Sequence, residues 1–227
     1  MNGRKVLLLG ILLLLPVLAF LFLQSFGRNA YKLRTYLPEP VGTARVGAPP
    51  VSGAPAAATG DTVFHRVSDS VLLRTGAAGQ PFHPPTELRD RIVVLGFGRP
   101  GATEPIDRAV TRGLARVQER YRAQPLVKLL VVAPEPAPNL AALAERAGAI
   151  SGKWTFATAA PGALRHLRTE LRDSAALANP NAPTRLWLLD KQRYLRGIYD
   201  PTDPREIDRL LTEVGVLLKI VQNPARP

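Results

Sequence analysis

An uninterrupted apolar run opens the chain. No charged residue occurs between Val6 and Gly27, and most residues of this run are leucine, valine, alanine or phenylalanine. As an α-helix, which rises about 1.5 Å per residue, the run is long enough to cross a bilayer core of roughly 30 Å. It is also longer than the apolar region of a cleavable signal peptide, which holds about 7 to 15 residues. The pattern therefore predicts an N-terminal membrane anchor, residues 1–35, with one uncleaved transmembrane helix.

The regular apolar spacing then disappears. From Pro38 to Gly60 the sequence contains five prolines, four glycines and several alanines, with no apolar periodicity. Stretches of this composition are typical of linkers. We therefore interpret residues 36–60 as a Pro/Gly/Ala-rich linker and residues 61–227 as one folded domain of ordinary size.

Short apolar runs alternate with amphipathic stretches in this domain. Val110, Leu114 and Val117, for example, are spaced three or four positions apart, which places them on one face of a helix. Continuous apolar runs, in contrast, indicate buried strands. We predict strands at residues 63–67, 70–75, 91–97, 125–133, 153–158, 184–190 and 193–200, and helices at residues 104–121, 139–148, 161–177 and 203–221.

The order of these elements indicates the fold class. We expect the strands at 63–67 and 70–75 to form a first hairpin, and those at 184–190 and 193–200 to form a terminal one. Between them, strand and helix alternate, which is the order of a thioredoxin-like domain. The prediction is an α/β fold with a thioredoxin-like central sheet flanked by helices, preceded by one transmembrane helix.

Composition narrows the chemistry that this domain can perform. The chain contains no cysteine, which excludes disulfides, thiolate metal sites and every thiol-based redox mechanism. No serine stands in a nucleophile-elbow context, and no glycine-rich phosphate loop or paired-carboxylate motif occurs. We therefore predict a protein without catalytic residues and without a cofactor.

The chain is strongly basic, with a formal net charge of +12. Its arginines are scattered along polar faces without interleaved aromatic residues or a recognised motif, so we predict no nucleic-acid partner. The charge is compatible with anionic lipid headgroups close to the anchor, or simply with a solvated arginine-rich surface. Basic residues flank the apolar run on both sides, so the positive-inside rule leaves the membrane orientation open.

Two segments of the domain carry a family resemblance. The first, LGFGRPGATEP at residues 95–105, joins a predicted strand to a predicted helix. It resembles the FGxTxCxxxCP loop of SCO/SenC proteins, a family of membrane-anchored, copper-handling relatives of thioredoxin. When Gly96 and Pro105 are aligned with that motif, the two cysteines of the family fall on Pro100 and Glu104 without a gap.

The second segment, APTRLWLLDKQRYLRGIYD at residues 182–200, resembles the histidine-containing loop of the same family and the two strands that follow it. Counting back from Asp190 places the family's histidine on Ala182. In the family, two thiolates and an imidazole bind copper, and soft sulfur ligands are what hold Cu(I). Because these positions read Pro100, Glu104 and Ala182 here, the resemblance implies an SCO-type scaffold without its metal and redox centre.

Glu104 has two interpretations. It falls in the first turn of the predicted helix at 104–121, beside Asp107, where a carboxylate interacts favourably with the helix dipole. It is therefore either an ordinary helix-stabilising residue or a negative charge that stands in for a thiolate.

The three histidines suggest no site. His166 and Glu170 are four positions apart on one predicted helix face, a spacing that can chelate a metal, but no further histidine or cysteine accompanies them. We predict a surface pair there rather than a metal site. His65 and His83 have no sequence partner that suggests catalysis, and Trp187 lies in an apolar run and is predicted to belong to the core.

These observations favour a non-catalytic function. We predict a membrane-anchored, SCO/SenC-like protein that binds a protein partner or serves in respiratory-oxidase assembly. As the resemblance implies, it would be a single-pass protein of the inner (cytoplasmic) membrane with its domain on the extracytoplasmic side. Two alternatives stay open: a copper-handling assembly factor that uses ligands outside the family pattern, and an enzyme of a different type.

The predicted partner surface lies where the two resembling segments would meet. It consists of Arg99, Glu104, Ala182 and Pro183. We expect Pro183 to lie beside the 100–104 loop and to follow a cis peptide bond, as a proline often does in the corresponding loop of the thioredoxin superfamily.

Overall fold

The computed structural model describes residues 14–18, 20, 33–39, 63–68, 73–75, 80–82, 84–99, 106–136, 139–179 and 181–222. The chain divides into two units, Met1–Lys32 and Leu33–Pro227. In the first unit, residues 14–18 are helical and their large apolar side chains are exposed. Within the described residues, no helix combines the length and apolar character that a membrane span needs. Most of the predicted anchor lies outside these residues.

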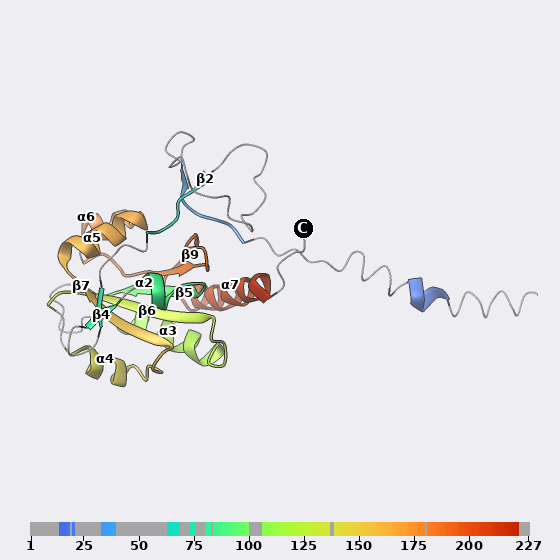
Figure 1. Ribbon diagram of the computed structural model, residues 1–227, viewed down its shortest axis with the longest axis horizontal. Coiled ribbons are helices and arrows are strands. Elements are labelled where there is room, and N and C mark those ends of the chain that lie inside the picture. Colours follow the sequence, from blue (N-terminus) through green and yellow to red (C-terminus); the bar gives the residue numbers. More distant parts are fainter. Residues whose placement is uncertain are drawn as a thin grey trace, which may run out of the picture. The chain divides into compact units, whose positions relative to one another are not determined.

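A seven-stranded sheet forms the centre of the second unit (Figure 1). Its strands lie in the order β4-β3-β7-β6-β5-β8-β9. Three of them, β5, β6 and β7, are parallel, whereas β3, β4, β8 and β9 join by antiparallel pairing. The strands are β3 (Leu73–Thr75), β4 (Gln80–Phe82), β5 (Ile92–Phe97), β6 (Val127–Pro134), β7 (Trp154–Ala159), β8 (Leu186–Leu189) and β9 (Leu195–Tyr199).

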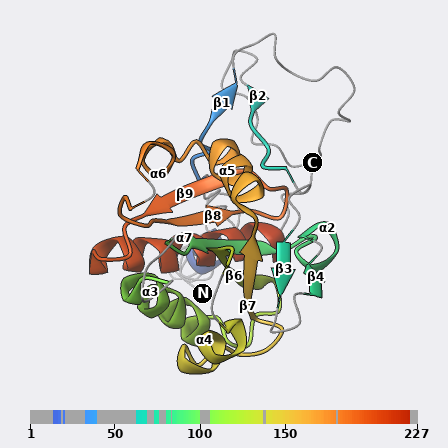
Figure 2. The same ribbon diagram turned by 90° about the vertical axis from the view of Figure 1, so that its left-hand side faces the viewer.

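Helices cover both faces of the sheet, as Figures 1 and 2 show. The helices are α2 (Pro84–Glu87), α3 (Arg108–Arg120), α4 (Leu140–Arg146), α5 (Pro161–Glu170), α6 (Ser174–Ala178) and α7 (Pro204–Gln222). One apolar cluster joins α3, α4 and α7 to the sheet, and a second joins α5 to the opposite face. The predicted α/β architecture, a central sheet with flanking helices, is confirmed.

Strand β5 contributes to both clusters, because its side chains alternate between the faces. Val94 packs on the α3 side, whereas Val93 and Leu95 pack on the α5 side. All six residues of β5 are buried, which explains why the sequence shows a continuous apolar run there. On α3, the predicted stripe of Val110, Leu114 and Val117 is likewise fully buried.

The predicted first hairpin, residues 63–67 with 70–75, is wrong. Strand β2 (Val63–Phe64) pairs with β1 (Pro38–Glu39), and β3 pairs with β4 and β7. In the β3–β4 pair, Leu73 lies opposite Phe82, and both side chains are buried in the cluster under α5. Burial of this cross-strand pair stabilises the observed pairing, and the spacing of apolar residues along one strand cannot reveal it.

The predicted helix at 161–177 is interrupted. Arg172 adopts a left-handed backbone conformation with φ of 51°, which ends the first helix, α5. Asp173 then accepts a hydrogen bond from the backbone N–H of Ala176 and caps α6. A short polar side chain at a helix start satisfies an otherwise unpaired backbone donor, so the two helices meet at an angle that the leucine spacing does not encode.

The segment before β1 packs on the domain. The backbone N–H of Tyr36 donates to the carbonyl of Leu195 in β9 at 2.9 Å, and Arg196 donates to the hydroxyl of Thr35. Because Pro38 pairs opposite Phe64 and Tyr36 bonds to Leu195, residues 36–39 of the predicted linker belong to the folded unit. The interior of that linker lies outside the described residues.

Candidate functional site

The end of β5 and the beginning of β8 lie side by side. These strands are antiparallel, with Gly96 opposite Leu186. The two segments that carry the sequence resemblance therefore leave the sheet at the same edge. Pro100 and Glu104 lie outside the described residues, so their predicted proximity to Pro183 stays a prediction.

The loop before β8 begins with a turn. The backbone N–H of Ala182 donates to the carbonyl of Asn179 at 2.8 Å, and Ala182 is buried while Pro183 is exposed. The expected cis bond is wrong, since the Ala182–Pro183 bond is trans. Among the described residues the cis X–Pro bond is Glu135–Pro136. Trans is the ordinary state of an X–Pro bond, since only about 5 to 6% of such bonds in folded proteins are cis.

Asp107, rather than Glu104, provides the carboxylate at the start of α3. The helix begins at Arg108, so Glu104 precedes it instead of lying in its first turn. The Oδ1 atom of Asp107 accepts a hydrogen bond from the N–H of Ala109 at 2.9 Å, which caps the helix. Its Oδ2 atom lies 2.6 Å from Nη2 of Arg99. The helix start therefore also positions the side chain of Arg99 beside the end of β5.

Arg168 is the main residue of this region that sequence reasoning missed. It belongs to α5 and has only 6% of its surface exposed. Its Nη2 donates to the carbonyl of Gly98 at 3.3 Å, and its guanidinium lies over the ring of Phe97, 5.0 Å from the centroid. A signal was available: position 168 falls within the apolar stripe formed by Leu164, Leu167 and Leu171, so its side chain must face the sheet.

Three buried polar atoms around the end of β5 have no hydrogen-bond partner. They are Nε of Arg99, Nε of Arg168 and Oγ1 of Thr184. Within the described residues a fourth such atom is the indole nitrogen of Trp154, which lies elsewhere, in the cluster with α3. Since most buried polar groups in proteins are paired, each of these atoms is an exception.

Asp173 is a charged group that acts on Arg168 electrostatically. Burial raises the pKa of this carboxyl group, and the positive charges of Arg168 and Arg185 partly counteract the rise. Burial likewise lowers the pKa of Arg168, against the attraction of Asp173. Asp173 uses Oδ1 to cap α6, so it balances the arginine at a distance without pairing with it.

The predicted pair of His166 and Glu170 is only part of a larger contact. The two side chains are 4.0 Å apart, whereas Nε2 of His65 lies 2.9 Å from the Glu170 carboxylate. The backbone N–H of Ser68 donates a hydrogen bond to the same carboxylate. Glu170 therefore connects α5 to the segment after β2. In the part of the chain that the structure describes, no three histidine or carboxylate side chains are arranged to hold a metal ion.

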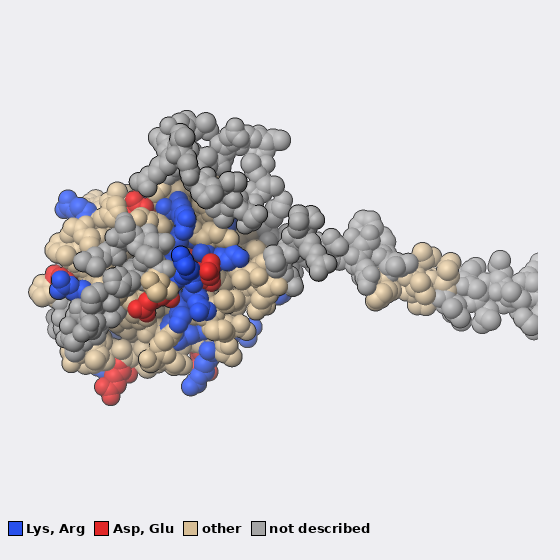
Figure 3. All heavy atoms as spheres, in the orientation of Figure 1, with Lys and Arg blue, Asp and Glu red and all other residues tan. Residues whose placement is uncertain are grey.

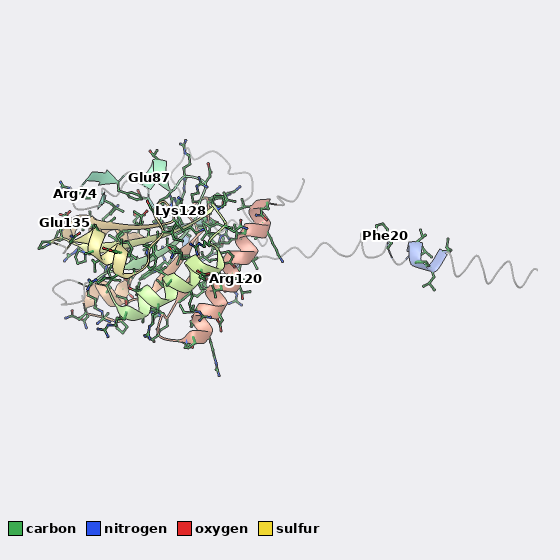
Figure 4. The ribbon with its side chains drawn as sticks, turned by 90° about the horizontal axis from the view of Figure 1, so that it is seen from below. Phe20, Arg74, Glu87, Arg120, Lys128 and Glu135 are labelled. Carbon is green, nitrogen blue, oxygen red and sulfur yellow. The ribbon has the colours of Figure 1, made fainter. Side chains whose placement is uncertain are left out.

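Carboxylates at this edge of the sheet are already engaged. Figure 4 labels Lys128 and Glu135, which lie at opposite ends of β6. The Glu135 carboxylate, at the same end of the sheet as Arg99, accepts a hydrogen bond from the hydroxyl of Thr158 at 3.1 Å. The edge therefore combines hydrogen-bond donors that lack acceptors with carboxylates that are committed elsewhere. Among the described residues, this arrangement offers no nucleophile and no metal centre.

Known proteins resemble this chain in structure but not detectably in sequence. The sequence matches no protein-family model and no curated protein. Solved structures resemble it: BsSco, a member of the Sco family of cytochrome c oxidase assembly proteins in which a disulfide switch was identified, is 13% identical with a TM-score of 0.55. That match covers 67% of this chain and 93% of BsSco. A putative electron transport protein from Aquifex aeolicus VF5 is also 13% identical, with a TM-score of 0.52 and coverage of 70% and 98%.

The likeness confirms the predicted thioredoxin-like fold. Identities this low carry no information about individual functional residues, and the same fold serves many functions.

Proposed function

We propose that this chain is a non-catalytic, SCO/SenC-like module that acts by binding another protein, in a role related to respiratory-oxidase assembly. The observation that carries the proposal is the edge where β5 ends and β8 begins. There, Arg99, Arg168 and Thr184 hold unpaired donors, while the chain has no cysteine with which to perform thiol chemistry. An edge whose described residues include no reactive group suits binding rather than catalysis.

The charge of the protein indicates what kind of partner it would bind. Figure 3 shows lysine and arginine side chains gathered in a band across one face of the domain, and the formal net charge is +12. Opposite charge accelerates association and suppresses wrong partners. We therefore expect an acidic partner surface.

The same proposal includes a membrane location. The apolar residues from Val6 to Gly27 would anchor the chain in the inner (cytoplasmic) membrane with a single span. Leu14, Leu15 and Phe20 expose most of their apolar surface, which in water is unfavourable and in lipid is not. By analogy with the SCO/SenC pattern, the domain would lie on the extracytoplasmic side.

Site-directed photo-crosslinking in native membranes tests the proposal. A photoreactive amino acid replaces the exposed Pro183 in the full chain, and a matched variant carries it at the exposed Glu145 on α4. We expect a discrete cross-linked protein from position 183 and none from position 145. If position 183 yields no product, or if both positions yield the same products, the proposed binding edge is wrong.

A further inference from the structure

We propose that the end of the sheet at which β5, β6 and β7 begin rests on the headgroups of an anionic lipid bilayer. We call it the basic end, and its cations are Arg89, Arg91, Arg122, Lys128 and Lys153. This inference rests on the membrane location in the proposed function. It adds which surface of the domain contacts the bilayer.

The sheet topology brings these cations together. Strands β5, β6 and β7 are parallel, so all three begin at the same end of the sheet. Arg91 directly precedes β5, Lys128 is the second residue of β6, and Lys153 directly precedes β7. The backbone N–H of Leu129 donates to the carbonyl of Lys153 at 2.9 Å, which places the two lysines on neighbouring strands at the same level.

The positive charge of the three strand-end cations is not neutralised within the fold. The side chains of Arg91, Lys128 and Lys153 donate to backbone carbonyls, which carry no net charge. Within the described residues, no carboxylate forms an ion pair with them. Burial lowers the pKa of Lys153, and the charge of Lys128 lowers it further. These two cations are therefore close enough to repel each other.

Exposed residues extend the positive surface toward the solvent. Arg89 lies two residues after α2, Arg122 lies two residues after α3, and both side chains are exposed. Glu87, Asp90 and Glu119 are the exposed carboxylates nearest to them in sequence. Five cations against three carboxylates leave a surplus of positive charge at the basic end.

The covalent chain keeps the basic end close to the predicted anchor. Tyr36 donates to the carbonyl of Leu195, the first residue of β9, and the register through β8 places Leu195 level with the start of β5. Tyr36 therefore lies at the basic end. It follows Gly27, the last residue of the apolar run, by nine positions, which can extend over at most about 32 Å. Leu33 already packs on the domain core, and it follows Gly27 by six positions, or at most about 21 Å.

A bilayer surface fits both the charge and the short connection. Basic residues beside a membrane span attract anionic lipids, and this attraction acts over about a Debye length, roughly 10 Å at moderate salt. Arg28, Lys32 and Arg34 in the connecting segment add to the same charge. The orientation also leaves the proposed binding edge free, because β5 begins at the basic end and finishes at that edge.

Fluorescence quenching on the full chain tests the assignment. Because the chain has no cysteine, one introduced cysteine carries a fluorophore at a single chosen position. Ser151→Cys places it at the basic end, three residues before β7, and Ala160→Cys places it directly after β7, at the opposite end. Both positions are exposed. The chain is reconstituted into phosphatidylcholine vesicles with or without phosphatidylglycerol, and a phosphatidylcholine with a nitroxide on its headgroup is the quencher.

We expect phosphatidylglycerol to increase quenching at position 151 at least twofold more than at position 160. High salt should reverse the increase, because it screens the attraction. Equal quenching at the two positions would overturn the proposed orientation. Quenching at position 151 that is the same with and without phosphatidylglycerol would overturn the recognition of anionic lipid.

Two charge variants locate the effect. Arg89→Gln with Arg122→Gln removes two exposed cations from the basic end, and Arg165→Gln with Arg205→Gln removes two exposed cations from α5 and α7. The first variant should lose at least half of the increase with phosphatidylglycerol, and the second should keep it. Equal losses would show that net charge alone is responsible and would overturn the basic end.

An acidic protein is the competing occupant. A photoreactive amino acid at position 151 that captures one discrete protein in native membranes, together with no quenching by the headgroup nitroxide, would assign the basic end to that protein and overturn the lipid assignment.

Alkaline extraction separates this inference from the proposed function. If the full chain is extracted from the vesicles, the membrane anchor is wrong. Quenching at position 151 on addition of phosphatidylglycerol vesicles to that unanchored chain would still support the basic end, and its absence would overturn it. If the chain resists extraction but position 151 is not preferentially quenched, the basic end is wrong and the anchor stands.

Discussion

The phenol ring of Tyr199 occupies the space above Gly197. A β-carbon at position 197 would lie 1.9 Å from the Tyr199 hydroxyl and 2.3 Å from Cζ. The two residues are two positions apart in β9, so their side chains leave the sheet on the same face. Tyr199 is fully buried, and glycine is what allows its ring to fold back over the strand.

Replacement of Gly197 by alanine should therefore destabilise the domain. Because the ring has to move within a packed core, we expect a loss of about 1–3 kcal/mol, the usual range for an overpacked site. Gly162 on α5 is the matched control, since a β-carbon there meets nothing within 4 Å. Gly162→Ala should be neutral or stabilising by up to about 1 kcal/mol. Urea denaturation measures both, and equal effects would contradict the packing argument.

Alkaline pH should destabilise the protein through Tyr199. Burial, followed by the hydrogen bond to Glu213, raises the pKa of this phenol well above its usual value of about 10. Above about pH 10, Tyr199 loses its proton in the unfolded chain but keeps it in the folded chain. The free energy of unfolding therefore falls as pH rises. Tyr199→Phe should make this decline shallower than in the wild type.

At neutral pH the Tyr199→Phe variant should be less stable by about 1 kcal/mol, because it loses the 2.6 Å hydrogen bond to Glu213. Glu213 keeps its contact with Arg209, so no unpaired charge results. Lys153, whose pKa burial lowers, contributes with the opposite sign at alkaline pH but equally in both proteins. Parallel curves of stability against pH for the two proteins would show that Tyr199 does not titrate as argued.

The buried ion pair of Asp190 and Arg196 should contribute more to the stability of the domain than an exposed ion pair does. Nε of Arg196 lies 2.6 Å from Oδ2 of Asp190, and both side chains are at least 90% buried. Asp190→Ala leaves the arginine without a counter-ion, so we expect a loss of about 3–5 kcal/mol. The exposed pair of Arg116 and Asp208, at 2.7 Å, is the control. Asp208→Ala should cost at most about 1 kcal/mol, and thermal unfolding that ranks the two variants the other way would refute the argument.

The segment before β1 should contribute to the stability of the domain. A fragment that begins at Leu33 keeps the hydrogen bond from Tyr36 to Leu195 and the contact of Thr35 with Arg196. A fragment that begins at residue 61 loses both and leaves Arg196 with one partner fewer. At about 1 kcal/mol for each hydrogen bond, we expect the longer fragment to be more stable by about 2 kcal/mol or more. Identical midpoints in urea would show that the segment does not stabilise the fold.

Copper binding distinguishes the proposed function from the copper-handling alternative. Without thiols, and with no suitable ligand set in the described residues, the full chain should not retain Cu(I) against a moderate competitor. Stoichiometric, submicromolar binding would favour the alternative. Restoring the family pattern with Pro100→Cys, Glu104→Cys and Ala182→His should increase Cu(I) affinity if the scaffold geometry persists. Ala182 is 9% exposed, so the histidine would need local rearrangement.

The sequence predicts those helices and strands whose own pattern of apolar residues identifies them. The stripe of Val110 and Leu114 on α3 is of this kind, as are the continuous apolar runs of β5 and β6. Pairings between distant short strands are different. Nothing in the local pattern near Leu73 indicates that its cross-strand partner is Phe82, because that choice depends on how the two side chains pack under α5.

The candidate site was harder to predict for a related reason. A charged residue on a helix is normally assigned to the solvent side, and Arg168 violates that rule while occupying a position in the apolar stripe. Its contact with Gly98 joins residues far apart in sequence. The predicted start of α3 at residue 104 is too early, because helix boundaries are poorly encoded in sequence. Glu104 and Asp107 are both plausible acids for a helix start, and the hydrogen bond to Ala109 selects Asp107.

The pairing of β1 with β2 limits the structural role of the Pro/Gly/Ala-rich sequence between them to connecting the two strands. With Pro38 opposite Phe64, residues 40–62 connect two strands that already lie side by side. The entropy of closing such a connection depends on the logarithm of its length, so doubling it costs only about 0.6 kcal/mol. That is less than the burial of one methylene group, about 0.8 kcal/mol. The connection is therefore free to vary in length and composition, provided that the two strands keep their register.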